Sequence, residues 1–216
     1  MNKYITRTEY NQLKKELTNF QKKLKFSSDE KMIENSKSFL TTNISELLGS
    51  RYDDHVDLLS IDQITEPGHV DHYLNALQPF VKDMIEISDT KLKKIFKKEK
   101  KLKLPNASQR SADNVYLGWV NHSIRKLYIA YEHDNQVLGM ACHINPSESN
   151  HTNCCTLCNH FGKANEVAFV SSICKGSSQE YRSIGFSVCL DSRECNKRIT
   201  SMETLKSLLL DVNGLD

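Results

Sequence analysis

Four cysteines in the last third of this 216-residue chain constrain its fold more than any other feature. Cys155 and Cys158 are separated by two residues (CTLC), and a second pair, Cys189 and Cys195 (CLDSREC), follows about thirty residues later. A Cys-x2-Cys turn presents two thiolates to one ion, and a second close pair completes a tetrahedron once the intervening chain folds back. The spacing therefore predicts one structural zinc ion held by Cys155, Cys158, Cys189 and Cys195.

Other cysteines compete for this role. Cys154 is adjacent to Cys155, although only position 155 gives the two-residue spacing, and Cys174 lies alone in a polar stretch. The second pair has five residues between its members, so its geometry is less sharply defined. A catalytic zinc keeps an open position and usually uses histidine or a carboxylate. Four thiolates leave no position for water, so we expect a closed, non-catalytic centre.

The sequence lacks the common enzyme signatures. It contains no GxxxxGK[ST], GxGxxG, GxSxG or HExxH pattern, and its eight glycines are few for phosphate-binding loops. We therefore expect no enzyme, no catalytic residue and no small-molecule substrate. The chain also has no apolar run near 18 residues and no signal-peptide order at its start, which predicts a cytoplasmic protein without a membrane contact. We expect it to be a monomer.

Cysteine use fits a reducing compartment. Seven cysteines in a cytosolic chain indicate a metal site with spare thiols, Cys142, Cys154 and Cys174, rather than a disulfide framework. A redox-sensing thiol protein remains an alternative, and it would require a reactive thiol of low pKa.

Charge is distributed unevenly along the chain. Residues 1–90 carry 11 basic and 15 acidic side chains, and residues 91–216 carry 18 and 12, so the two parts differ in sign. This asymmetry favours an acidic or nucleic-acid-rich partner that meets the carboxy-terminal part first. The alternative is that the charge only keeps the surface soluble.

Residues 1–87 are predicted to form a helical bundle domain. Apolar residues recur at steps of three and four from Tyr10 to Leu24, after a possible capping box of Thr6 and Glu9. A second helix is expected to begin after Ser27 and to end at Gly49. A weaker pattern follows Val56, and a fourth helix is expected over residues 70–85 despite Pro79. Four antiparallel helices with short connections make a bundle.

Residues 88–216 are predicted to form a second domain, which opens with a lysine-rich helix. The segment KLKKIFKKEKKLK holds eight lysines and one glutamate in thirteen residues. Leu92, Ile95 and Phe96 can seat one helical face on the protein while the lysines reach solvent. Such a helix suits a hinge with a cationic face, or a solvated linker with no specific partner.

The rest of the second domain is predicted to form strands and a zinc finger. Strands are expected at 115–120, 126–131 and 137–144, with a tight hairpin between the last two. A further hairpin joins 167–170 to 186–188, and a capping box of Thr200 and Glu203 predicts a terminal helix. The predicted class is α+β: an antiparallel helical bundle, then a small antiparallel sheet with a treble-clef zinc finger over about residues 150–216.

Several of these motifs together resemble one known family. KLKKIFKKEKKLKLP, YLGW, RKLYIAY, CTLCN and CLDSRECNK occur here in the order found in the elongation-factor-G-binding proteins of the fusidic-acid-resistance (FusB) type. The likeness covers residues 88–198 well and the helical first part only in layout. The resemblance implies a protein that binds elongation factor G through its zinc-finger domain and helps the factor leave a ribosome on which fusidic acid has trapped it. Contact with the ribosome would then be indirect.

The resemblance also implies a binding surface of aromatic and basic side chains. Before the second cysteine pair, relatives carry lysines and a tyrosine, whereas this chain reads YRSIGFSV. The candidate contacts are Phe161, Phe169, Tyr181, Arg182, Phe186 and Lys197, although Phe169 and Phe186 are equally suited to packing the finger. The main alternative function is a zinc-dependent module that binds RNA or the ribosome directly through the lysine segment and the finger.

Overall fold

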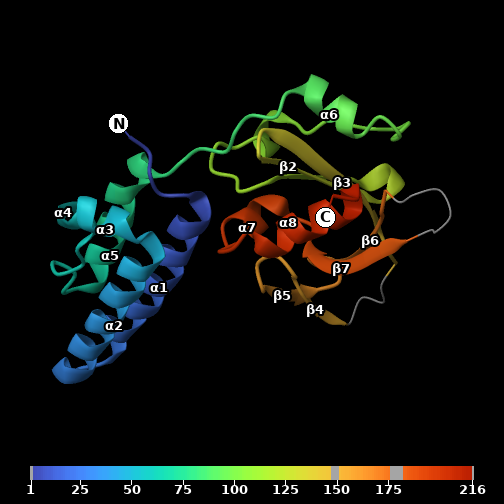
Figure 1. The fold of residues 1–216 in the computed structure, drawn as a ribbon. Helices are drawn as coiled ribbons and strands as arrows, with labels where there is room; N and C mark the ends of the chain where they lie inside the picture. The colour runs from blue at the N-terminus through green and yellow to red at the C-terminus, as the bar shows by residue number, and fades with distance from the viewer. Residues whose placement is uncertain (1, 147–150, 176–181, 216) are drawn as a thin grey trace. The chain divides into compact units, whose positions relative to one another are not determined.

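The computed structural model describes residues 2–146, 151–175 and 182–215, and the chain divides into two compact units (Figure 1). One unit spans Met1–Lys82 and the other spans Asp83–Asp216. Each has its own hydrophobic core, so each is described by itself. Within the described ranges, no helix is long and apolar enough to span a membrane.

The first unit is built on two long helices, α1 (Arg7–Phe26) and α2 (Glu30–Leu48), which lie antiparallel (Figure 1). The predicted capping box is confirmed, because Thr6 accepts from the Glu9 amide while the Glu9 carboxylate accepts from the Thr6 amide. Asp29, rather than Ser27, caps α2. The helix ends at Gly49, whose φ of 57° suits glycine.

Shorter helices complete this unit: α3 (Ser50–Asp54), α4 (Val56–Leu59) and α5 (Pro67–Leu77), followed by the 3₁₀ turn η1 (Gln78–Phe80). The prediction of one helix through residues 70–85 is wrong. Pro79 cannot continue an α-helix, and beyond it the chain becomes extended. Val81 then forms a parallel bridge with Ile5, and Ile85 is 59% exposed.

The second unit contains a five-stranded antiparallel sheet of order β1-β2-β3-β6-β7. A separate pair, β4 and β5, forms the cysteine-bearing hairpin. Asp134 and Asn135 both have positive φ in the β2–β3 turn, which confirms the predicted tight hairpin. The strands are β1 (Leu117–Asn121), β2 (Lys126–His133), β3 (Gln136–Ile144), β4 (Thr152–Cys154), β5 (Phe161–Lys163), β6 (Val167–Ile173) and β7 (Ser183–Cys189).

Helices cover both faces of this sheet. On one face, α8 (Glu203–Asn213) buries Leu205, Leu209 and Val212 in a core that includes Ile129 and Val188. On the other face, α6 (Asp89–Ile95) is tied by Leu92 and Phe96 to a cluster with Trp119 and Tyr128. Trp119 and Tyr128 are fully packed inside this cluster. The remaining short elements are η2 (Ala107–Gln109), η3 (His122–Ile124) and α7 (Ser192–Asn196).

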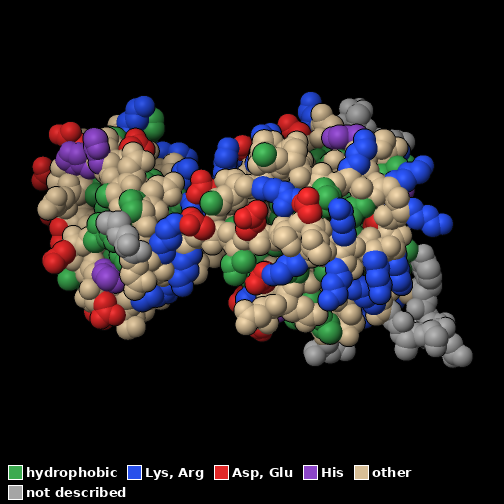
Figure 2. All heavy atoms as spheres, turned by 90° about the horizontal axis from the view of Figure 1, so that it is seen from above, with side chains coloured by type: hydrophobic (Ala, Val, Ile, Leu, Met, Phe, Trp, Pro, Cys, Tyr) green, Lys and Arg blue, Asp and Glu red, His purple; other side chains and the backbone are tan. Residues whose placement is uncertain are grey.

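Two boundaries differ from the sequence prediction. The lysine-rich helix ends at Ile95, and the segment after it continues as turns and loop with its lysine side chains exposed (Figure 2). Thr200 does not cap α8. The Ser201 hydroxyl instead accepts from the Glu203 amide, because the helix begins later than the capping pattern suggested.

Candidate zinc centre

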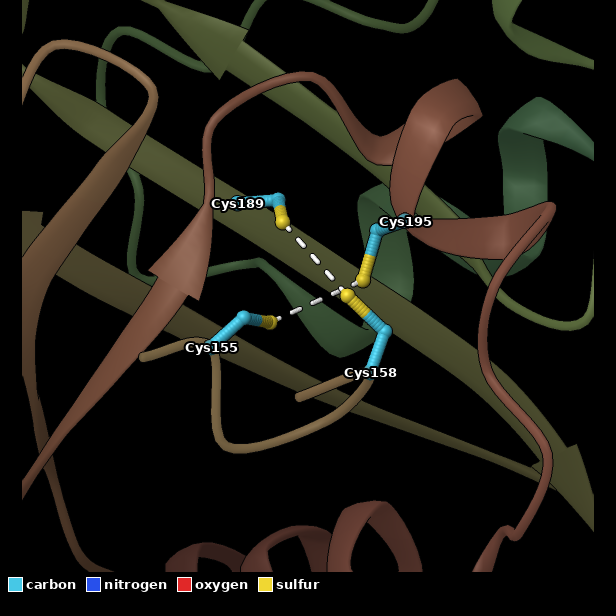
Figure 3. Close-up of side chains that lie close together, drawn as sticks. All are labelled: Cys155, Cys158, Cys189 and Cys195. Carbon is cyan, nitrogen blue, oxygen red and sulfur yellow. Dashed lines mark hydrogen bonds between the residues drawn. The ribbon is translucent and has the colours of Figure 1, made fainter. Parts of the chain in front are cut away.

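The four predicted cysteines come together in the second unit (Figure 3). Their sulfurs lie within 4.8 Å of one another, with 3.9 Å between Cys155 and Cys195 and 3.6 Å between Cys158 and Cys189. Tetrahedral zinc with bonds of about 2.3 Å to sulfur places its ligands about 3.8 Å apart. The observed separations therefore suit one zinc ion and are too long for disulfide bonds.

The first pair lies on the turn of the β4–β5 hairpin. The Cys155 amide donates a hydrogen bond to the His160 carbonyl at 2.8 Å, and the Asn159 amide donates one to the Cys155 carbonyl at 2.9 Å. Asn159 adopts a φ of 57°, a conformation that asparagine tolerates better than most residues. The Thr156 amide donates to the Ser187 carbonyl of β7, which ties the hairpin to the main sheet.

The second pair lies where β7 passes into α7. Cys189 is the last residue of the strand, and Cys195 lies inside the helix. Asp191 caps α7 through its carboxylate, which accepts from the amides of Arg193 and Glu194. A cysteine turn, a strand hairpin and a helix that carries the last cysteine together make the predicted treble clef.

Polar side chains support the cysteines in a way that the sequence analysis missed. Arg198 points a guanidinium nitrogen at the Cys189 sulfur, 3.6 Å away, and the buried Tyr116 hydroxyl hydrogen-bonds Cys195. Asn196 uses its amide to join α7 to the chain leading into β1. In the sequence, the nearness of Asn196 and Arg198 to Cys195 was the one sign that these two side chains support the site.

Electrostatics favour a cation at this position. Hydrogen bonds from the other three thiols hold the pKa of Cys158 well below its usual range. Hydrogen bonding to Cys155 and Cys158 raises the pKa values of Cys189 and Cys195. Four thiolates at these separations would repel one another, and a divalent cation would let all four sulfurs ionise.

The spare cysteines lie outside this cluster. Cys154 is exposed and Cys174 is half-buried. Burial raises the pKa of Cys142 to about 12, which leaves that thiol protonated and unreactive. With four sulfurs around one point and no water position required, the site can fix the chain but offers no open coordination for a substrate.

The predicted partner contacts fall into three groups. Phe161 and Phe169 are 69% and 44% exposed, and Arg182 and Lys197 are also at the surface. Phe186 is only 6% exposed and belongs to the hydrophobic core, which favours the alternative that its ring packs the finger. Tyr181 lies outside the described residues.

Comparison with known families agrees with this geometry. The sequence profile described as "FBP C-terminal treble-clef zinc-finger" matches residues 90–211, more than half of the chain. The chain belongs to this family. A second profile, described as "Elongation factor G-binding protein, N-terminal", matches residues 4–85. The family thus accounts for the closed cysteine site as a zinc finger, with zinc as its metal.

One solved structure extends the likeness of this FBP-family chain to both units. The fusidic acid resistance protein FusC is 23% identical, with a TM-score of 0.75 over 98% of each chain. At this identity the match establishes a shared fold. No curated protein matches the sequence.

Proposed function

We propose that this protein binds elongation factor G and promotes its release from ribosomes stalled by fusidic acid. The observation that carries the proposal is the presence, on one chain, of both family profiles: the zinc finger at residues 90–211 and the elongation-factor-G-binding amino-terminal module at residues 4–85. The FusC-like fold over the whole chain supports it. The proposed partner is cytoplasmic, so we place the protein in the cytoplasm. We also propose that it is a monomer.

Within this proposal, Cys155, Cys158, Cys189 and Cys195 hold one structural zinc ion. The separations of their sulfurs support this assignment. The ion joins the β4–β5 turn to the junction of β7 and α7, and so fixes two segments that are distant in sequence. Its role is to hold the neighbouring surface in shape.

The factor-binding surface is proposed to include Phe161, Phe169, Tyr181, Arg182 and Lys197. Phe169 lies on the outer face of β6, where its ring covers Gly185 of β7. A side chain at position 185 would collide with that ring, because an added Cβ would lie 2.5 Å from Phe169 Cζ. Exposed aromatic rings on a rigid support are typical anchors of a protein interface.

The proposed mechanism makes and breaks no covalent bond. Binding shifts the factor away from the ribosome only if the protein prefers the released factor, or a conformation of it that no longer fits the ribosome. The shift cannot exceed the difference in affinity for the two states. No enzymatic step is required.

Two measurements test the proposal. In the first, ribosomes are pelleted with elongation factor G and fusidic acid; adding the protein should move the factor to the supernatant, and an unchanged pellet would contradict the release step. In the second, purified factor without RNA should form a one-to-one complex with the wild type and with Cys154→Ser, but not with Cys155→Ser. Zinc content should fall only in Cys155→Ser, because Cys154 lies outside the cluster.

A further inference from the structure

A dense group of ammonium groups lies beside the sheet and has no part in the zinc centre. We call it the lysine surface. Its members are exposed, and all but one come from α6 and the loop after it: Lys93, Lys94, Lys97, Lys98, Lys100, Lys101, Lys103 and Lys175. Lys175 follows β6 in sequence, yet partial burial of its ammonium group and the nearby charges of Lys98 and Lys97 lower its pKa. Two distant segments thus bring like charges together.

The segment that carries these lysines is firmly attached to the sheet. Phe96 packs edge-on against Trp119 and Tyr128, with ring centroids 5.7 and 5.2 Å away. The Trp119 indole donates to the Lys103 carbonyl at 2.7 Å, and the Asn121 amide donates to the Lys101 carbonyl at 3.1 Å. The lysines are therefore held in place by their backbone while their side chains remain in solvent.

Acidic residues near this surface already have other partners. Glu99 binds Lys126 at 2.7 Å, and Glu132 binds Lys91 at 3.2 Å. Asp89 pairs with Arg110 at the start of α6. Among the described residues, no ion pair reaches the seven lysines between positions 93 and 103. Their positive charge is thus left for an external anion.

The chemistry of the surface distinguishes among partners. The apolar residues of the segment face inward: Leu92 is fully buried and Phe96 is 4% exposed. Protein interfaces are enriched in aromatic residues and depleted in lysine, so a surface made mainly of lysine is a poor protein interface. A phosphate backbone, in contrast, is bound by such groups without regard to sequence. Figure 2 looks down on α6 and displays blue side chains gathered over this part of the unit.

We propose that the lysine surface binds the phosphate backbone of RNA. A hollow in this surface is lined by Lys93, Lys97 and Lys100 together with Glu99 and the apolar Phe96, Leu102 and Leu104. A phosphate there would meet three ammonium groups and one carboxylate that Lys126 already pairs. This contact would keep the protein close to ribosomal RNA. The choice of RNA over DNA rests on the proposed function, whereas the phosphate chemistry does not.

Binding of the full-length protein to a fluorescent 20-nucleotide oligouridylate, followed by anisotropy across a salt series, tests the proposal. If about four to six phosphates are neutralised, the logarithm of affinity should fall with the logarithm of salt at a slope of about −3 to −4. The variant Lys97→Glu/Lys98→Glu/Lys100→Glu should bind at least about tenfold more weakly with a shallower slope. The matched variant Lys14→Glu/Lys15→Glu/Lys22→Glu carries the same change in net charge on exposed positions of α1, and should bind within about twofold of wild type.

Several outcomes would overturn the proposal: no binding of the oligonucleotide near 100 mM salt, an equal loss in both triple variants, or tighter binding to phosphatidylserine vesicles. Tighter binding to duplex DNA would keep the phosphate site but reject RNA as its ligand.

Zinc content and complex formation with elongation factor G are measured on the same variants. Retention of both would establish that the lysine variant is folded, whereas loss of the factor complex with intact RNA binding would reassign the surface to the protein partner. Failure of the factor complex in wild-type protein concerns only the proposed function.

Discussion

Asn196 hydrogen-bonds both backbone polar groups of Tyr116: its carbonyl oxygen accepts from the Tyr116 amide at 2.9 Å, and its side-chain nitrogen donates to the Tyr116 carbonyl at 3.0 Å. The same side chain accepts from the Val115 amide at 2.7 Å and donates to the Ser192 carbonyl at 2.8 Å. The helix that carries Cys195 is therefore attached to the chain leading into β1 by contacts that do not involve the metal.

Replacing Asn196 with alanine should destabilise the second unit by about 3 kcal/mol, because two buried amides lose their acceptor and each such loss costs about 1–3 kcal/mol. Urea denaturation followed by the fluorescence of Trp119, which lies in this unit, measures the effect. The neighbouring Lys197→Ala removes only an exposed ion pair with Glu194 and should change stability by less than about 0.5 kcal/mol. Equal stability of both variants would contradict a structural role for the Asn196 amide.

Arg198→Ala should weaken zinc retention about tenfold, since loss of a group that supports metal ligands typically costs 10- to 100-fold in affinity. Arg198 contacts the Cys189 sulfur, and its positive charge favours the thiolate form that binds zinc. Competition with a colourimetric chelator measures the change. Arg193→Ala, which loses only a surface contact with Asp191, is the control and should retain zinc like the wild type.

Phe169 and Phe186 should separate binding from stability. Phe186→Ala removes a buried ring and should cost about 3–5 kcal/mol of folding free energy. Phe169→Ala, in the neighbouring strand, should cost less than about 1 kcal/mol because that ring is 44% exposed, yet it should weaken the complex with elongation factor G. Denaturation and factor binding are measured on both variants. Unchanged factor binding by a folded Phe169→Ala would remove this residue from the proposed surface.

Glu9 should make the first unit sensitive to acid. Burial alone would raise the pKa of Glu9, but hydrogen bonds from Arg51 and Thr6 outweigh it and lower that pKa. The stabilisation is therefore present above the unfolded value of about 4.3 and is lost as pH falls through the lower folded value. Since Arg51 is about one-third exposed, the pair should contribute about 1 kcal/mol.

Amide hydrogen exchange in α1 measures this contribution. Glu9→Gln can keep the capping box through its amide oxygen, and should be less protected than wild type by about 1 kcal/mol at pH 6 and equally protected near pH 3. Glu46→Gln, at an exposed position of α2, is the control and should follow wild type at both pH values. A Glu9→Gln deficit that persists at pH 3 would point to altered capping rather than to the ion pair.

Local patterns predicted much of the fold. The capping box of Thr6 and Glu9 identified the start of α1, and the short polar segment around Asp134 and Asn135 identified the β2–β3 hairpin. The cysteine spacing predicted four residues whose sulfurs lie together in the structure. It could do so because a Cys-x2-Cys turn is a local structure and the second pair has few alternatives. In the first two cases the deciding interactions lie within a few residues along the chain, whereas the cysteines form two local pairs that meet across about thirty residues.

The errors arose where distant contacts decide. Val81 joins Ile5 rather than extending α5, a pairing that spans nearly the whole first unit. The helix of the lysine segment ends at Ile95, and Glu99, four residues later, binds Lys126 and Tyr128 on β2. For Phe186 the sequence left contact and packing equally open, and the β6–β7 pairing places it on the buried side of the sheet. These partners lie too far apart along the chain for a local sequence pattern to pair them.

The bridge between Ile5 and Val81 has a further consequence for the first unit. Tyr4 and Ile5 both donate to the Phe80 carbonyl, and Lys82 donates to the Ile5 carbonyl, so the entry and exit of this unit are neighbours. A chain whose ends meet tolerates having them joined and new ends opened elsewhere. The helical unit is thus suited to circular permutation, with new termini in the exposed turn between α1 and α2, and to transplantation as a closed module into a surface loop of another protein.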